Sequence, residues 1–195
     1  MSRMQKLVNS NAIILILFSL AAGCRESRIP KPRGFFRIDL PDKEYVKYDT
    51  SCPFSFEYPV YGRISYDLES ESEPCWFNIV FPGFKAKIYM SYKSIMNDLE
   101  SVLKESYDLA YSHSVKADAI DELPYQNPEQ KVYGILFDIK GNTASSVQFF
   151  VTDSTRNYLR GALYFNAQPR EDSLAPVIDF FREDMIHIVE TLEWK

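Results

Sequence analysis

The first 24 residues constrain this chain most, because they decide which part of it folds and in which compartment. Residues 1–6 carry basic side chains and no acid, and the apolar run 12–22 leads to Cys24. A basic start, a short apolar stretch and small residues at the end are typical of a signal peptide. As a helix, residues 12–22 would rise about 17 Å against roughly 30 Å of bilayer hydrocarbon, which is too short to span. We therefore expect residues 1–23 to direct export and to be removed.

The residues before Cys24 resemble a bacterial lipobox. Leu20 to Gly23 are mostly small, which lets a peptidase reach the bond in an extended segment at the membrane surface. The departure from the pattern is Ala21, where a lipobox has Leu. The resemblance implies that Cys24 becomes the N-terminus with a thioether-linked diacylglycerol and an amide-linked acyl chain, which together form a stable anchor. An ordinary secretory signal with an incidental cysteine is the alternative.

Composition limits the partners of the exported part. Removal of residues 1–23 takes away Arg3 and Lys6 and no acid, so the formal net charge changes from −5 to −7. We expect no nucleic-acid partner, because such binding needs clustered cations. Residues 35–195 suit one globular domain, and the 15 % aromatic content of the chain supplies large apolar surface for a core.

Residues 24–34 are expected to form the lipidated N-terminus and a linker. Two prolines and four basic residues stiffen and solvate this segment, which spans about 3.1 Å per residue when extended. The segment then holds the domain away from the bilayer. Contact of its basic residues with anionic headgroups is the alternative.

Export bears on two further cysteines, Cys52 and Cys75, because it decides whether they can form a disulfide. An oxidising compartment allows them to pair, and the bridge would close a loop of about 24 residues and contribute about 3 kcal/mol in the chain-entropy account. Two buried thiols are the alternative. No histidine lies near either cysteine in the sequence, so we expect no metal site.

Alternation of apolar and polar residues predicts an antiparallel sheet. It is cleanest in residues 84–92, which we expect to pair with 76–81 through a turn at Pro82 and Gly83 and to keep one wet face. Residues 54–58 predict another strand, with 61–66 as its hairpin partner. A meander follows in the strands 132–140, 144–152 and 158–165. Its second face is mixed in character, which predicts a further layer over part of that side.

Two segments have helical periodicity. The first is residues 94–112, with Ser94 as N-cap, and the second starts at Asp172 and Ser173 with Pro176 in its first turn. We expect surface loops at 67–74, where repeated acids are solvated and do not hold Ca²⁺, and at 123–129, and a last short strand at the C-terminus. The order predicts a single α+β domain with helices packed on an antiparallel sheet, a layout that looks like the Mog1/PsbP type.

Four segments resemble the gliding motility lipoprotein GldD family of Bacteroidetes. They are PRGFFRIDLP (32–41), GILFDIKGNTASSVQFFVTDST (134–155), LRGALYF (159–165) and DSLAPVIDFFRED (172–184). The resemblance covers essentially the whole chain and implies a membrane-anchored accessory of the gliding machinery, which in these bacteria is tied to the type IX secretion system. It implies no known reaction, because the family offers no catalytic motif.

The same resemblance bears on localisation. Surface-exported lipoproteins of these bacteria often carry an acidic run after the lipidated cysteine, whereas Cys24 is followed by Arg-Glu-Ser-Arg. We therefore expect the domain on the periplasmic face of the outer membrane.

Two classes of function remain: a non-catalytic module that docks other gliding or secretion proteins, or a glycan, and an envelope hydrolase. The chain has two histidines, and neither lies in a Gly-x-Ser-x-Gly or His-Glu-x-x-His motif. We expect His113 to act as a capping-type residue after a helix and His187 to face solvent. Asp138 and Asp153 would act as acid and base only in a shared cleft. The missing chemistry favours the interaction module, with no cofactor.

The candidate docking surface is the polar patch around the turns of the meander. It consists of Lys140, Asn142, Asp153, Arg156 and Arg160. Arginine is frequent at binding hot spots, and Arg160 is expected on the face opposite Leu159 and Leu163. Solvated turns with one stacked arginine are the alternative.

Overall fold

The structure is a computed structural model that describes residues 38–66, 73, 75–96, 98–166 and 171–195, without the side chains of 171–173. The predicted signal peptide 1–23, Cys24, the linker 24–34 and most of the acidic loop 67–74 lie outside the described residues. The described residues all belong to one compact unit, Phe35–Lys195.

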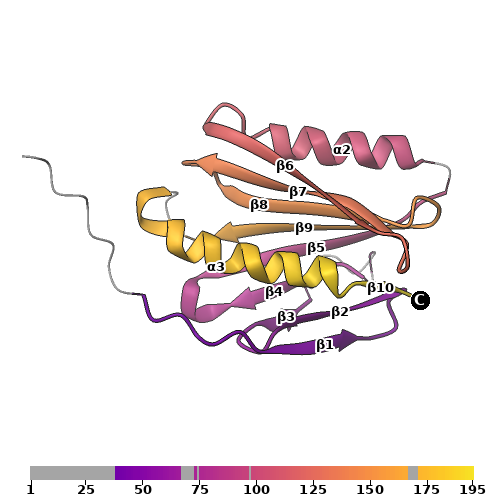
Figure 1. Cartoon of the computed structure of the whole chain (residues 1–195), viewed down its shortest axis with the longest axis horizontal. Helices are drawn as coiled ribbons and strands as arrows, with labels where there is room; N and C mark the ends of the chain where they lie inside the picture. Colours follow the sequence, from indigo (N-terminus) through magenta and orange to yellow (C-terminus); the bar gives the residue numbers. More distant parts are fainter. Residues whose placement is uncertain (1–37, 67–72, 74, 97, 167–170) are drawn as a thin grey trace, which may run out of the picture. The chain divides into compact units, whose positions relative to one another are not determined.

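The described part of the domain contains a large and a small antiparallel sheet (Figure 1). The seven-stranded sheet has the order β3 (Arg63–Ser65), β4 (Phe77–Phe81), β5 (Ala86–Ser94), β9 (Asn157–Phe165), β8 (Ser145–Thr152), β7 (Val132–Gly141) and β6 (Ala117–Asn127). The three-stranded sheet has the order β1 (Tyr45–Asp49), β2 (Phe54–Pro59) and β10 (Glu193–Trp194). The helices are the 3₁₀ turn η2 (Pro82–Phe84), α2 (Leu99–Tyr111) and α3 (Glu171–Glu190).

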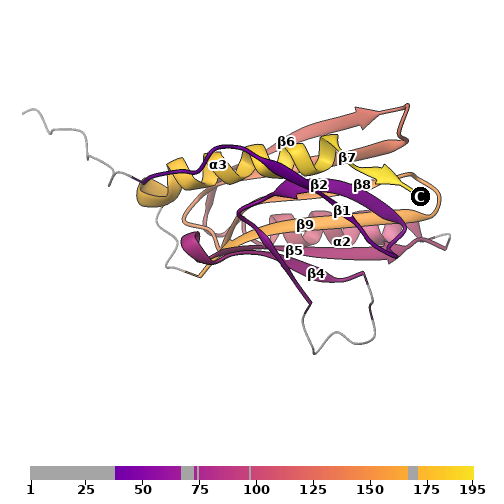
Figure 2. The same ribbon diagram turned by 90° about the horizontal axis from the view of Figure 1, so that it is seen from below.

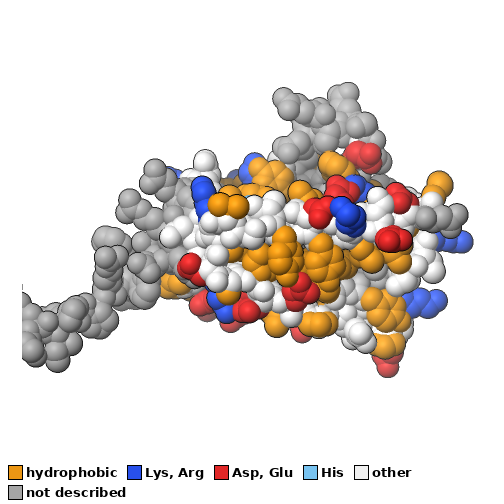
Figure 3. Space-filling view, turned by 90° about the horizontal axis from the view of Figure 1, so that it is seen from above, with side chains coloured by type: hydrophobic (Ala, Val, Ile, Leu, Met, Phe, Trp, Pro, Cys, Tyr) orange, Lys and Arg blue, Asp and Glu red, His pale blue; other side chains and the backbone are white. Residues whose placement is uncertain are grey.

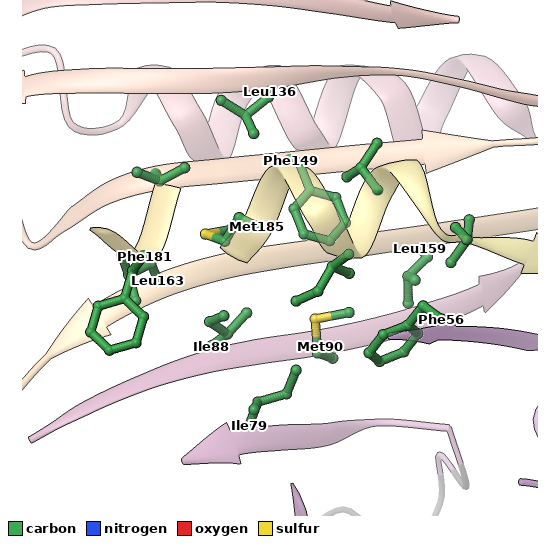
Figure 4. Close-up of a cluster of buried hydrophobic side chains, with 14 of the residues drawn as sticks. Phe56, Ile79, Ile88, Met90, Leu136, Phe149, Leu159, Leu163, Phe181 and Met185 are labelled. Carbon is green, nitrogen blue, oxygen red and sulfur yellow. The ribbon is translucent and has the colours of Figure 1, made fainter. Parts of the chain in front are cut away.

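The two faces of the large sheet are covered differently. Helix α3 and the small sheet pack on one face and α2 lies over part of the other (Figures 1 and 2). The α3 side holds the main core, which Figure 4 shows in part. It combines Phe54 and Phe56 of the small sheet, Ile88, Met90, Phe149, Leu159 and Leu163 of the large sheet, and Phe181, Met185 and Ile188 of α3. The predicted α+β class, with helices on an antiparallel sheet and a second layer over the meander, is confirmed.

Strand β5 explains the two faces at the level of sequence. Ala86, Ile88 and Met90 are buried in the main core, whereas Lys87 and Tyr89 between them point to the other face, because successive side chains alternate across a strand. The predicted pairing of this strand with β4 is confirmed, with Ile79 opposite Ile88 in the register.

A glycine permits close packing inside this core. A Cβ at Gly161 would come within 2.3 Å of the Phe149 ring on the neighbouring strand. The absence of a side chain at this position therefore makes room for a fully buried aromatic ring.

Helix α2 begins later than predicted. Ser94 ends β5 and is not an N-cap, because the main-chain N–H of Ile95 donates to the carbonyl of Arg156 at 2.6 Å and holds the chain extended. The N-cap is Asp98. Helix α3 begins at Glu171, so Pro176 lies just beyond the first turn, where it removes one intrahelical hydrogen bond.

Two strand assignments also need correction. Residues 123–129 were predicted as a loop, but 123–127 belong to β6, an edge strand of the large sheet. Edge strands tolerate proline because they pair with a neighbour on one side only. Residues 61–66 do not pair with β2. A turn closed by the Gly62 N–H on the Pro59 carbonyl carries the chain to the large sheet, where β3 pairs with β4.

Candidate functional site

The predicted docking residues do not form one patch. Lys140 and Asn142 lie at the β7–β8 turn, whereas Asp153 and Arg156 lie at the β8–β9 turn. Successive turns of a meander lie at opposite ends of the shared strand, which here is eight residues or about 26 Å long. Arg160 lies on β9, on the α2 side, with Leu159 and Leu163 on the other face as predicted.

Contacts within the turns account for two of these residues. The carboxylate of Asp153 accepts hydrogen bonds from the main-chain N–H groups of Thr155, Arg156 and Asn157 at 2.7–2.9 Å. Burial opposes ionisation of Asp153, but these hydrogen bonds outweigh it and lower its pKa. Lys140 forms an exposed ion pair with Asp121 on β6. Asp153 thus has a structural role at its turn, whereas Lys140 makes an exposed contact with the neighbouring strand.

Arg160 lies in a groove between α2 and the open part of the large sheet, which we call the α2 groove. It has a volume of about 450 Å³. Its lining includes Tyr89, Lys93, Arg160 and Tyr164 from the sheet and Glu105 and Leu109 from α2. The groove forms because α2 packs on Phe137, Phe150 and Tyr158 of β7, β8 and β9 and stops short of β5.

Polar contacts fix the walls of the α2 groove. Lys93 Nζ and Glu105 Oε2 form an ion pair at 2.6 Å that joins β5 to α2. The guanidinium of Arg160 donates to Oε1 of Gln148, whose own side-chain Nε2 is buried without a hydrogen-bond partner. Arg160 has no carboxylate partner among the described residues. Its remaining N–H groups are therefore available to a ligand.

A second hollow continues the groove along the same face, and we call it the lysine hollow. It has a volume of about 520 Å³ and includes Lys85 and Lys87 in its lining. Tyr89 and Tyr164 line both hollows and meet edge to face, with ring centroids 5.3 Å apart. Sequence reasoning missed Tyr89 and Lys87 as site residues, although the alternation in residues 84–92 places them on one face.

The outer surface of α2 and β6 is a second apolar area. Figure 3 shows hydrophobic side chains in the middle of this face with acidic and basic side chains around them. The exposed large apolar side chains of these two elements outside the α2 groove are Tyr111 and Leu123. The hydroxyl of Tyr111 on α2 donates a hydrogen bond to the carboxylate of Glu122 on β6 at 2.7 Å. Part of this surface is therefore occupied by a contact within the domain.

The two histidines lie in different environments. His113 follows α2, whose C-cap is Ser112. Burial and the nearby Arg160 lower the pKa of His113, which disfavours the capping cation that the sequence predicted. His187 was predicted to face solvent, which is wrong. Its ring stacks on Tyr45 at 3.6 Å between centroids, and its Nε2 lies 2.9 Å from a carboxylate oxygen of Glu57.

The proposed acid and base are also apart. Asp138 pairs with Arg182 of α3 at 2.9 Å, on the α3 side of the sheet. Asp153 lies at the far end of β8, about 20 Å along the strand direction. Among the described residues, no group of three or more His, Cys, Asp or Glu side chains is arranged to hold a metal ion.

A buried carboxylate fixes the segment before β1. Asp184 of α3 is fully buried and accepts hydrogen bonds from Lys43 at 2.7 Å, Tyr45 at 3.0 Å and Tyr61 at 2.6 Å. The Lys43 ammonium also lies 3.4 Å from the centre of the Phe180 ring. Burial and then the hydrogen bond to Asp184 raise the pKa of Tyr61. This cluster joins the first described segment to α3.

Cys52 and Cys75 form a disulfide, the pairing favoured by the cysteine count. Their Cα atoms lie 5.8 Å apart. Cys52 precedes β2 of the small sheet and Cys75 precedes β4 of the large sheet. The bond therefore connects the two sheets directly.

Fold and site together define the class of protein: an α+β domain with an antiparallel sheet, one face closed by a helix and a small sheet and the other left open as a groove. Neither described helix is long and apolar enough to cross a membrane. The chain belongs to the family of gliding motility lipoproteins GldD, whose model matches residues 25–194. It is therefore a lipoprotein of gliding motility that associates with the cell envelope.

Among solved structures, the solution structure of cyanobacterial PsbP (CyanoP) from Synechocystis sp. PCC 6803 is similar, with a TM-score of 0.47 and 11 % identity over 82 % of this chain and 98 % of that chain. A search of curated proteins finds no match.

Proposed function

We propose that this protein is an outer-membrane lipoprotein, anchored through Cys24 with its domain in the periplasm, that serves the gliding machinery and the linked type IX secretion system as a non-catalytic interaction module. The observation that carries the proposal is the family match, which starts at Arg25, directly after Cys24. Several buried acyl chains make a stable anchor, so the domain remains at the membrane where its partners are.

The environment of the ionisable groups supports a non-catalytic role. Burial and Arg160 lower the pKa of His113, and the His187 ring lies against Tyr45 and Glu57. Asp138 is paired with Arg182, and Asp153 closes a turn. A general acid or base must instead reach a substrate within hydrogen-bond distance.

The anchor is tested by Cys24→Ala, with Ser27→Ala as a matched control in the same segment. We expect the Cys24 variant to leave the membrane fraction and the control to remain there. Separation of inner and outer membranes and protease treatment of intact cells then locate the domain, which we expect in the outer membrane and protected. Unchanged fractionation of Cys24→Ala would count against lipidation.

The interaction role is tested by affinity purification of the lipidated protein from native envelopes. We expect gliding or secretion components to co-purify, and their absence would contradict the proposal. Replacement of both His113 and His187 by Gln addresses the hydrolase alternative. Motility should persist wherever protein abundance is normal, and loss of motility at normal abundance would favour an enzyme.

A glycan-binding function is a second candidate, favoured by one observation. The two hollows that meet at Tyr89 and Tyr164 offer aromatic rings beside basic side chains. Glycan binding at this site is compatible with protein docking, because the two functions can use different surfaces of the domain.

A further inference from the structure

The face formed by the α2 groove and the lysine hollow has a charge opposite to that of the whole protein. Its lining includes the cations Lys85, Lys87, Lys93 and Arg160 and one carboxylate, Glu105, whereas the chain carries a net charge of −5. Lys93 already neutralises Glu105. The other three cations have no carboxylate partner within the described part of the chain, so this face attracts anions.

Aromatic rings divide this face into two compartments. Tyr89 is 41 % exposed, although it is large and packs against Tyr164. The Lys87 ammonium lies 5.1 Å from the centre of the Tyr89 ring. Each compartment is within the usual size range of small-molecule sites, and each combines aromatic surface with a few polar groups, as such sites do.

The geometry points to a binding site for an acidic saccharide, with sugar rings against Tyr89 and Tyr164 and carboxylates on Lys87 and Arg160. This inference rests on the glycan-binding candidate proposed above and names the class of glycan; it does not depend on the anchor or on the machinery served. The apolar C–H face of a sugar ring matches the face of a tyrosine, and Arg160 has free N–H groups for a bidentate bond to a carboxylate. The cations without a carboxylate partner among the described residues lie in both hollows, Arg160 in the α2 groove and Lys85 and Lys87 in the lysine hollow, which suits a saccharide with carboxylates on successive rings.

An extended acidic peptide fits this face less well. Strands β4, β5 and β9 are interior strands whose main-chain groups already pair with a neighbour on each side. A peptide that adds to a sheet gains affinity from main-chain hydrogen bonds at a free edge, and the free edges here are β3 and β6. A ligand on this face therefore binds mainly to side chains. The hydroxyl and carboxylate groups of a saccharide can form hydrogen bonds with such side chains.

The test is calorimetric titration of the detergent-solubilised full-length protein with trigalacturonic acid, maltotriose and hexaglutamate. We expect trigalacturonic acid to bind, with an affinity that falls as salt is added, and both other probes to bind at least tenfold more weakly. Tyr89→Ala and Arg160→Gln should each lower the affinity at least tenfold. Tyr111→Ala and Lys104→Gln, an exposed tyrosine and an exposed lysine of α2 outside the groove, are the matched controls and should leave it unchanged.

Each other outcome would overturn the inference. Absence of binding at millimolar trigalacturonic acid would contradict a saccharide site on this face. Equal binding of maltotriose would contradict recognition of the carboxylates. Equal binding of hexaglutamate with the same residue dependence assigns the face to acidic peptides. If Arg160→Gln fails to fold, Lys87→Gln replaces it, because Lys87 lies on the rim of the lysine hollow and contacts the Tyr89 ring; unchanged affinity in that variant would also contradict the site.

Discussion

The two faces of the seven-stranded sheet differ in how completely they are covered. On the α3 side, aromatic and aliphatic side chains from both sheets and the helix form one buried cluster that includes Phe149 and Phe181. On the other side, α2 covers β7, β8 and part of β9 and leaves Lys87, Tyr89 and Arg160 around an open groove. The closed face therefore supplies stability, whereas the open face leaves side chains accessible to a ligand.

The largest expected effect comes from emptying the closed face. Phe181 is fully buried and lies 4.6 Å from Phe81 and 5.3 Å from Phe84 between ring centroids. Phe181→Ala should lower the free energy of unfolding by about 4 kcal/mol, because it leaves a cavity. Urea unfolding measures this change.

A matched truncation on the open face serves as the control. Leu109 of α2 is 40 % exposed at the groove, so Leu109→Ala should cost less than about 1 kcal/mol. Similar costs for the two variants would contradict the difference between the faces.

The next effect concerns the buried carboxylate of the closed face. Asp184→Asn removes the negative charge that neutralises Lys43. It also weakens the hydrogen bonds that the carboxylate accepts from the hydroxyls of Tyr45 and Tyr61. Loss of one partner of a buried ion pair costs 3–5 kcal/mol, and since the Lys43 side chain is 24 % exposed we expect about 2 kcal/mol. Thermal unfolding measures the loss, and Asp179→Asn, on the exposed side of the same helix, should change little.

The smallest effect is a pH dependence on the open face. Burial and Arg160 lower the pKa of His113 in the folded protein, so the unfolded chain binds a proton more readily below pH 6.5. The stability contribution is full above that pH and is lost as the pH falls. Replacement by Gln should flatten the decline of the unfolding free energy between pH 7 and 5, as urea titrations at several pH values would reveal. An unchanged slope would exclude His113 as its source.

The sequence predicted the regular parts of the fold because periodicity reports burial directly. Residues 84–92 alternate cleanly since one face lies in the main core and the other in solvent. Edge strand β6 was missed because Pro124 and its polar neighbours are typical of a loop. An edge strand nevertheless tolerates proline. The start of α2 was missed because Ile95 fits the helical pattern although a main-chain contact with Arg156 holds it extended.

The site was less predictable because it is assembled from distant segments. Arg160 was identified from its residue type and face, but its neighbours in the groove, Tyr89 and Glu105, lie on β5 and α2. The predicted patch instead joined residues close in sequence, whose turns lie at opposite ends of β8. Only the strand order, with β9 next to β5, brings Arg160 and Tyr89 to the same groove.

The most direct test of the difference between the faces is gliding by cells whose chromosomal copy carries Lys87→Gln together with Arg160→Gln, with protein abundance and membrane fractionation measured in the same cultures. If the open face binds a ligand that gliding needs, the double variant should lose motility at normal abundance and location. Phe181→Ala should impair motility only as far as protein abundance falls. Normal gliding by the double variant would contradict a binding role for this face.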